Sequence, residues 1–465
     1  MPVAGRLCTI FTPRVYLLAS IVVQAGGLLV TSQAQSLWMF LAGRAMTGVG
    51  SASVTPVAFI LVAELTSPRR RGLLFGCINT GYTAGVACGA IIAGALEPVV
   101  GWRAVFWLQI PFGLSAALVA FVAIPPTTKM IQTSKTSWAE KLSRIDYLGV
   151  LTLISSVILL SYSLSAPRVQ LTPILLSAAA LVLFVFVEAN WAVEPIVPVP
   201  VLRSRGNIFT GIATIGIMTA RWGVLFYTPT YAITLRGWSP ASAGLMLIPT
   251  NAGFGLGGLA AGWLHIRRSG SFYMSCLVMF VLFSGSMFTL SGISTPDSNI
   301  YFYVSLLFFN GFVTGALLNY SLAHVLHLTP ASTHVIVIPL NATFRSISGS
   351  FGSAVSGGLF LRTLQHTLKT GFAKRGISGR AELIKKLVGT PLLVQKLSGV
   401  DKIVAVEGYT TALRTLFMAG AGLAVIVFFF QAGTGWEGPD LPKKEDELSN
   451  PDTLSPVVSR EPVPS

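Results

Sequence analysis

Stretches of about 20 mostly apolar residues recur along nearly the whole chain, and each could cross the ~30 Å hydrocarbon layer of a bilayer as a helix. Of the 465 residues, 52% are hydrophobic and only 11% are charged, whereas about 25% of the residues of a soluble domain are charged. So few charges could not cover the surface of a soluble particle of this size. The sequence therefore predicts an all-α, polytopic membrane protein.

We predict about twelve membrane-spanning helices, separated by segments that are charged or rich in proline and glycine. SPRRRG (67–72) and HIRRSG (265–270) are clear separators of this kind. The predicted spans are residues 15–33, 37–64, 73–96, 104–124, 146–165, 171–190, 208–234, 240–264, 271–291, 301–325, 335–361 and 411–431.

These spans divide the chain into four predicted parts. Residues 1–126 hold four spans and form an incomplete N-terminal half, and residues 127–207 form a linker with two spans. Residues 208–431 form a C-terminal half of six spans, with an outer loop at 362–410. Residues 432–465 are acidic and rich in Pro and Ser, and we predict a disordered cytoplasmic tail there.

The basic residues predict the orientation in the membrane. With a cytoplasmic N-terminus, most Lys and Arg residues of the connections fall on the cytoplasmic side, as the positive-inside rule requires. Basic cytoplasmic loops then explain the net charge of +15, and we predict no nucleic-acid partner. The predicted outer loop also contains many Lys and Arg residues, but long loops follow the rule weakly. We expect short amphipathic helices in that loop.

Glycines recur at helical spacing in the third predicted span, GYTAGVACGAIIAG (81–94). Gly81, Gly85 and Gly89 are four residues apart and share one helix face, and Gly94 follows. Such a smooth face lets another helix approach closely. Two interpretations stay open: a pivot between helices that rock, and static packing of small residues. GFGLGGLAAG (253–262) predicts a second surface of this kind.

Arginines inside predicted spans need an explanation, because a charge at the bilayer centre costs at least about 2.5–3.5 kcal/mol. Arg44 lies in MFLAGRAMTGVG (39–50), and Arg221 lies in IGIMTARWGVLFY (215–227). Arg221 either attracts an anionic substrate into a cavity or snorkels to the interface. Arg345, in TFRSISG, is either a gate residue or an interfacial anchor.

Other polar and aromatic residues within the spans are candidates for a substrate cavity. A mostly apolar and aromatic cavity would suit a hydrophobic small molecule. The three asparagines either line this cavity or form hydrogen bonds across helices. The candidates are Trp222, Phe226, Tyr227, Tyr231, Asn310, Asn319 and Asn341.

Several of these segments together resemble a known family. GRAMTGVGSA, SPRRRG, the glycine-rich span and GWRAVFWLQIPFG are similar to the major facilitator superfamily. RIDYLG (144–149) and TFRSISGSFGSAVSG resemble its fungal fourteen-helix drug:proton antiporter group, which includes multidrug pumps and vacuolar basic amino-acid transporters. The resemblance implies two helical halves, and it implies that Arg44 is the motif arginine linked to proton transfer. It also places Glu64 at the acidic position that ends the same helix. For Arg44, the alternative that stays open is a structural arginine whose donors are satisfied by backbone carbonyls.

The chain departs from the family pattern in two respects. It begins at a segment that resembles the loop between the family's second and third helices, so we expect the first two helices to be missing. A proton-coupled carrier needs a titratable group within the membrane. Glu64, Asp146 and Glu188 all lie near the predicted cytoplasmic ends of spans, and no carboxylate lies near the middle of one.

The sequence thus predicts a secondary transporter that exports a small organic molecule, a drug or a fungal secondary metabolite, by proton-coupled alternating access. Two alternatives stay open: vacuolar uptake of basic amino acids, and a truncated membrane protein that does not transport. The predicted partners are the bilayer, the small-molecule substrate and protons, at the plasma membrane rather than the vacuole. No motif indicates an enzyme, a cofactor or a metal site.

Overall fold

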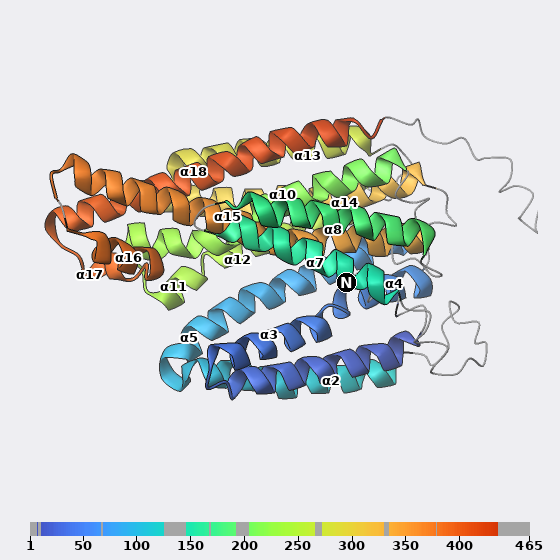
Figure 1. The fold of residues 1–465 in the computed structure, drawn as a ribbon. Coiled ribbons are helices and arrows are strands. Elements are labelled where there is room, and N and C mark those ends of the chain that lie inside the picture. Colours follow the sequence, from blue (N-terminus) through green and yellow to red (C-terminus); the bar gives the residue numbers. More distant parts are fainter. Residues whose placement is uncertain are drawn as a thin grey trace, which may run out of the picture.

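The computed structural model describes residues 7, 11–66, 68–124, 146–166, 169–191, 204–265, 272–329, 334–377 and 379–435. Every regular element within these ranges is a helix, which confirms the predicted all-α fold. Figure 1 shows a smaller layer, with α2, α3 and much of α5, lying beside a larger bundle that contains α10 and α12 to α15.

The N-terminal part consists of α2 (Pro13–Ser32), α3 (Leu37–Ser51), α4 (Val54–Leu65) and α5 (Pro68–Ala123). The predicted span 37–64 is interrupted, because α3 ends before Ala52 and α4 begins after Ser53. Helix α5 contains two predicted spans and bends at Gly101, whose φ of 77° is a conformation that favours glycine. The bend turns the chain back across the membrane.

The linker part is the helix pair α7 (Tyr147–Ser165) and α8 (Leu171–Asn190). The Asp146 side chain caps α7 by accepting a hydrogen bond of 2.8 Å from the backbone N–H of Gly149. Ser156 and Ser177 donate their hydroxyls to each other's backbone carbonyls and so join the two helices. Arg362 of α15 donates to the carbonyl of Ala166, which fastens this pair to the C-terminal part.

The C-terminal part begins with the 32-residue helix α10 and continues to residue 435. Its core contains fully buried aromatic side chains such as Phe283, Tyr303 and Phe417. Its elements are α10 (Arg205–Arg236), α11 (Pro240–Gly244), α12 (Leu247–Ala260), the π-helix η1 (Ala261–His265), α13 (Tyr273–Ile293), α14 (Ile300–Leu328), α15 (His334–Lys374), α16 (Ala381–Gly389), α17 (Leu393–Lys396) and α18 (Gly399–Ala432).

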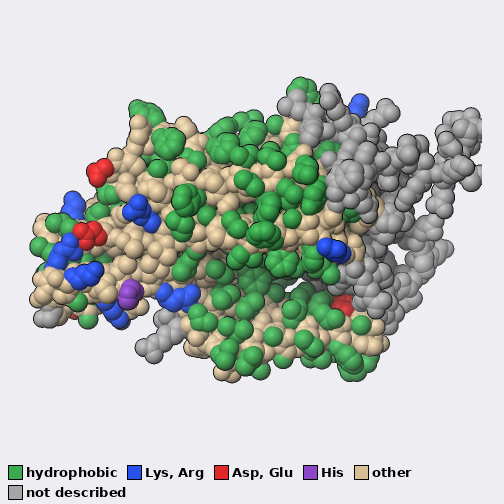
Figure 2. Space-filling view, turned by 90° about the horizontal axis from the view of Figure 1, so that it is seen from above, with side chains coloured by type: hydrophobic (Ala, Val, Ile, Leu, Met, Phe, Trp, Pro, Cys, Tyr) green, Lys and Arg blue, Asp and Glu red, His purple; other side chains and the backbone are tan. Residues whose placement is uncertain are grey.

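The described residues contain 11 segments that are long and apolar enough to cross a membrane. The predicted span 335–361 is not among them, although α15 covers it as one long helix that carries Arg345 and Arg362. Large apolar side chains lie on the outside, and Val122 and Val182 are 76% and 70% exposed. Figure 2 shows hydrophobic side chains over the middle of one face and Lys and Arg near the end that holds α16 and α17.

The predicted outer loop 362–410 is largely helical. Helix α15 extends to Lys374 and α18 begins at Gly399, so both enter the predicted loop. The short helices α16 and α17 lie between them, and α16 buries Ile384 and Leu387 on one face, as expected for an amphipathic helix. An ion pair of 2.9 Å between Arg375 and Glu407 joins the ends of α15 and α18.

Helices α12 and α14 cross at glycines from both sides. A Cβ atom added at Gly253 or Gly257 would overlap a backbone carbonyl of α14, and one added at Gly311 or Gly315 would overlap a carbonyl of α12. This confirms the close packing predicted from GFGLGGLAAG (253–262), and it identifies the partner surface on α14. The crossing fixes α12, which carries two residues of the cavity described next.

Candidate functional site

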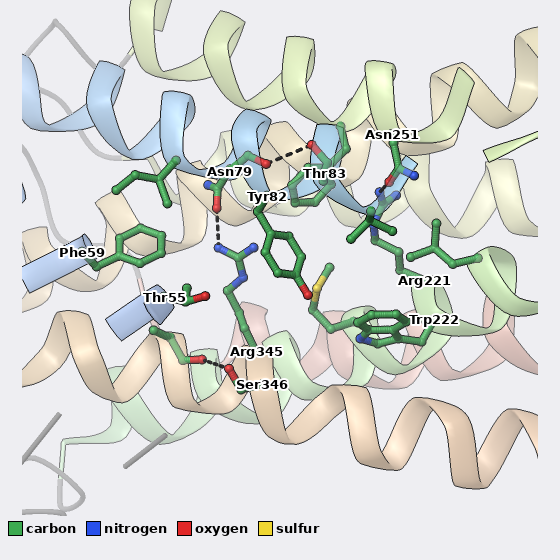
Figure 3. A pocket seen from close by; sticks show the side chains of 16 residues that line it. Thr55, Phe59, Asn79, Tyr82, Thr83, Arg221, Trp222, Asn251, Arg345 and Ser346 are labelled. Carbon is green, nitrogen blue, oxygen red and sulfur yellow. Dashed lines mark hydrogen bonds between the residues drawn. The ribbon is translucent and has the colours of Figure 1, made fainter. Parts of the chain in front are cut away.

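A cavity of about 150 Å³ lies where the N-terminal part meets the C-terminal part. Helices α4 and α5 of the N-terminal part and helices α10, α12 and α15 of the C-terminal part supply its lining (Figure 3). The lining residues are Thr55, Phe59, Ile78, Asn79, Tyr82, Thr83, Val86, Met218, Arg221, Trp222, Leu225, Asn251, Phe254, Ala342, Arg345 and Ser346.

Arg221 is the most deeply buried charged group of this cavity, with 3% of its surface exposed. Its Nη1 donates to the hydroxyl of Thr250 at 3.3 Å, and its Nη2 donates to Oδ1 of Asn251 at 3.1 Å. The guanidinium lies over the ring of Phe254, 4.3 Å from the centroid. Arg221 therefore points into the protein interior and does not snorkel to the membrane surface.

Arg345 connects the two parts of the molecule across the cavity. Its Nη1 donates to Oδ1 of Asn79 on α5 at 2.9 Å. Tyr82, one turn further along α5, lies between Arg345 and Arg221 in Figure 3. Close to this contact, Phe59 and Phe75 of the N-terminal part pack against Ile338 and Ala342 of α15. Arg345 thus lies in the interior, at the contact between the two parts, and is not an interfacial anchor.

The cavity carries an unbalanced positive charge. Among the lining residues that the structure describes, two are Arg and none is Asp or Glu. The hydrogen-bond acceptors that surround both guanidiniums are neutral hydroxyl and amide oxygens. A buried charge that lacks a counter-ion is costly in a protein interior. The arrangement therefore favours an anion over a cation as the occupant.

Trp222 is the one predicted aromatic residue that lines the cavity. Its ring stacks on Phe226 at 5.4 Å, but Phe226 is 47% exposed and lies outside the cavity. Tyr227 packs on Phe360, with 4.2 Å between ring centroids, and also lies outside. Consecutive residues of a helix are about 100° apart, so side chains five and six positions after Arg221 point away from the cavity face.

The remaining candidates are not among the described cavity lining, and three of them form contacts between helices. Tyr231 is fully buried and stacks on Tyr303, 4.2 Å between centroids. Asn310 donates to Ser286 at 2.8 Å, and Asn319 donates to the carbonyl of Gly258. Asn341 does not line the cavity. For Asn310 and Asn319, hydrogen bonding across helices was therefore the correct interpretation.

Of the two residues implied by the proton-transfer motif, Arg44 is not among the described residues that line the cavity. Arg44 is exposed on α3, and its guanidinium is 5.4 Å from the centre of the Phe106 ring. Glu64 lies in α4, and its side chain is outside the described part of the structure. Their role in proton coupling stays a prediction.

The predicted glycine face of α5 has no described neighbour in this conformation. Cβ atoms added at Gly81, Gly85 or Gly89 would meet nothing within 4 Å. Gly94 differs, because its added Cβ would lie 3.5 Å from Cα of Ala241 in α11. At about 100° per residue, Gly81, Gly85 and Gly89 lie about 160°, 120° and 80° around α5 from Asn79. Static packing therefore does not explain them here.

Asn79, Tyr82 and Asn251 are among the polar cavity residues that the sequence did not predict. Each is a polar group within an otherwise apolar span, which is the signal that drew attention to Asn310 and Asn319. Asn79 and Tyr82 are three positions apart and share a helix face. Asn251 precedes the glycines that pack on α14. Whether its side chain faces the cavity depends on which face of α12 meets that helix, and this cannot be inferred from the local sequence.

The fold and the cavity define a polytopic membrane carrier built of two helical parts around a central cavity. The chain belongs to the Major Facilitator Superfamily, whose family profile matches residues 1–353. It is a secondary transporter and not an enzyme.

Relatives among characterised proteins are distant. MFS transporter L2 of Phoma sp. is 23% identical over 92% of this chain and 72% of its own length. The vacuolar membrane amino acid uptake transporter fnx2 of Schizosaccharomyces pombe is 24% identical over 77% of this chain, which spans 62% of fnx2. The MFS-type efflux transporter ffsH of Aspergillus flavipes is 24% identical over 91% of this chain and 76% of its own length.

Solved structures agree with this fold. The human organic anion transporter MFSD10 (TETRAN) superposes with a TM-score of 0.54 at 14% identity, over 92% of this chain and 79% of its own. A variant of the fucose:proton symporter FucP of E. coli superposes with a TM-score of 0.51 at 12% identity, over 94% and 87%. At these identities the likeness shows the fold alone.

Proposed function

We propose that the protein exports small organic molecules by alternating access, in exchange for protons. The observation that carries this proposal is the central cavity, whose lining comes from both parts of the molecule. A site between two helical parts becomes open to either side of the membrane when the parts rock against each other. The names of relatives such as the efflux transporter ffsH support export as the direction.

Proton coupling requires a titratable group within the membrane. The described cavity lining holds no carboxylate, so the proton would be carried outside the cavity. Arg44 and Glu64 are the residues that we propose for this role, because Arg44 matches the family's motif arginine linked to proton transfer and Glu64 matches the acidic position that ends the same helix. We propose the plasma membrane as the location, because export of a drug or metabolite requires it.

Vacuolar uptake of basic amino acids is the second candidate function, and the name of the relative fnx2 favours it. A basic amino acid carries a cationic side chain, which would need a carboxylate partner. Arg221 and Arg345 instead place two positive charges at the cavity. Repulsion between like charges argues against a cationic substrate.

Transport by the full-length protein tests the proposed function. Membrane vesicles that contain it should accumulate a labelled organic acid or neutral drug in response to a pH gradient, and a protonophore should abolish accumulation. Radiolabelled lysine in the same vesicles tests the second candidate. Lysine uptake without movement of any organic probe would favour that candidate, and no transport of any probe would contradict both.

The open glycine face of α5 gives a further prediction about transport. Gly85→Ala should leave the protein folded, because the added Cβ has no neighbour within 4 Å. If the face is a pivot that closes against another helix during the cycle, Gly85→Leu should slow transport by about tenfold, equivalent to ~1.4 kcal/mol on one step. Yield from size-exclusion chromatography and vesicle transport rates measure both. A Gly85→Leu variant that transports normally would exclude the pivot.

A further inference from the structure

We infer that the central cavity is an organic-anion site, which binds an apolar or aromatic molecule through a single carboxylate. This inference rests on the proposed transport function and names its class of substrate. Arg221 and Arg345 both belong to the C-terminal part and line the same cavity, and their described hydrogen-bond acceptors are neutral. A bound carboxylate would supply the missing counter-charge and would offset the cost of burying the guanidiniums.

The buried polar atom of the described cavity lining that has no hydrogen-bond partner is a donor. A guanidinium has donors only, so Asn251 turns its Oδ1 toward Arg221 and its Nδ2 away from it. That Nδ2 is buried and has no hydrogen-bond partner among the described residues, and Asn251 is 3% exposed. The hydroxyl-bearing ring of Tyr82 lies between the two arginines (Figure 3). Carboxylate oxygens accept hydrogen bonds and do not donate them, so they complement this set.

The rest of the lining suits the body of such a molecule. Phe59, Met218, Trp222 and Phe254 give the cavity apolar and aromatic walls. Its volume of about 150 Å³ is similar to that of an engineered protein cavity that binds benzene. In this conformation the cavity therefore accommodates about one ring beside the acidic group, and a larger substrate requires the two parts to separate.

Binding of the anion would also act on the contact between the two parts. Arg345 donates to Asn79 across the cavity, from α15 to α5. A carboxylate is a stronger acceptor for a guanidinium than an amide oxygen is, so it competes with Asn79 for Arg345. The hydrogen bond between the two parts is then replaced by one to the substrate, and this exchange couples binding to the movement that opens the cavity.

A binding comparison on the purified full-length protein in nanodiscs tests the inference. Benzoate and benzamide have nearly the same shape, but only benzoate carries a charge. Benzoate should raise the thermal unfolding midpoint in a saturable way, and benzamide should not. Equal shifts with both ligands, or no shift with benzoate, would overturn the inference. Chloride and inorganic phosphate are tested in the same way. If either raises the unfolding midpoint as much as benzoate does, the site binds inorganic anions and the inference of an organic-anion site is overturned.

Variants locate the binding site. Arg221→Gln and Arg345→Gln should each weaken benzoate binding by about tenfold or more, the effect of losing a hydrogen bond to a charged group. Lys386→Gln removes one positive charge from an exposed ion pair with Glu382 on α16, and should bind benzoate as the unmodified protein does. Benzoate binding that survives both arginine substitutions would overturn the assignment. If a variant fails to fold, the comparison of benzoate with benzamide on the unmodified protein still decides.

The two proposals fail in distinguishable ways. If vesicles transport a neutral drug but benzoate does not bind, the anion site is wrong and the proposed transport function stands. If benzoate binds through Arg221 and Arg345 but no probe crosses the membrane, the anion site stands and transport is wrong.

Discussion

Gly257→Leu is expected to leave almost no folded protein in the membrane, and Gly257→Ala should lower the free energy of unfolding by about 1–3 kcal/mol, the usual cost of overpacking. A Cβ at Gly257 would overlap the backbone carbonyl of Phe312 on α14, and backbone cannot move aside as a flexible side chain can. Two helices would have to separate, and close packing is the main force between helices in lipid. Thermal unfolding in detergent, followed by size-exclusion chromatography, measures the effect.

Gly85→Ala is the matched control for this prediction. It makes the same chemical change within a membrane helix, but at a position with open space around it. Both substitutions gain up to about 1 kcal/mol of helix propensity, so the difference between them isolates the steric cost. If Gly257→Ala proves as stable as Gly85→Ala, the close crossing of α12 and α14 is wrong.

Asn79→Asp is expected to reduce transport by about 10–100-fold while it raises the thermal stability of the protein. The Oδ1 of Asn79 accepts a hydrogen bond of 2.9 Å from Arg345, and a carboxylate at that position would turn this bond into an ion pair. Charge-assisted hydrogen bonds are roughly twice as strong as neutral ones. We expect the ion pair to stabilise the contact between the two parts by about 1.5–3 kcal/mol, which is typical of a hydrogen bond to a charged group. A free-energy difference of this size corresponds to the roughly 10–100-fold reduction in transport. The two parts would be held together, and the carboxylate would occupy the arginine that the substrate needs.

Asn79→Ala is the control, because it removes the acceptor without adding a charge. It should weaken the contact between the two parts, lower the unfolding midpoint and leave the cavity positive. Transport by Asn79→Asp at the normal rate would show that the Arg345 contact neither holds the parts together nor takes part in substrate binding.

The sequence predicted the membrane helices well because their signal is local. Each predicted span needs only a run of apolar residues, and the described helices fall on these runs. The differences in detail have local causes too. The helix breaks after Ser51, in a Gly- and Ser-rich stretch, although Leu37–Val62 remains one candidate span, and α15 and α18 extend into the predicted loop through residues that are polar but still helical.

The cavity could be predicted only in part, because its lining depends on how helices are rotated and paired. Arg221 and Arg345 were found because a charge within an apolar span is conspicuous. Trp222 was found because it is adjacent to Arg221. Tyr231 and Asn310 carry the same kind of signal, yet they fill contacts within the C-terminal part. Asn79 was missed because its role depends on which face of α5 meets Arg345 of α15.

Side-specific labelling at Ser346 tests the central claim, that one cavity between the two parts opens alternately to each side of the membrane. Ser346 lines the cavity on α15, next to Arg345. Ser346→Cys would be introduced after Cys8, Cys77, Cys88 and Cys276 are changed to Ser, and a membrane-impermeant thiol reagent would be added from either side. We expect reaction from both sides, slowed when a substrate occupies the cavity. Reaction from one side only, with no change on adding substrate, would contradict alternating access.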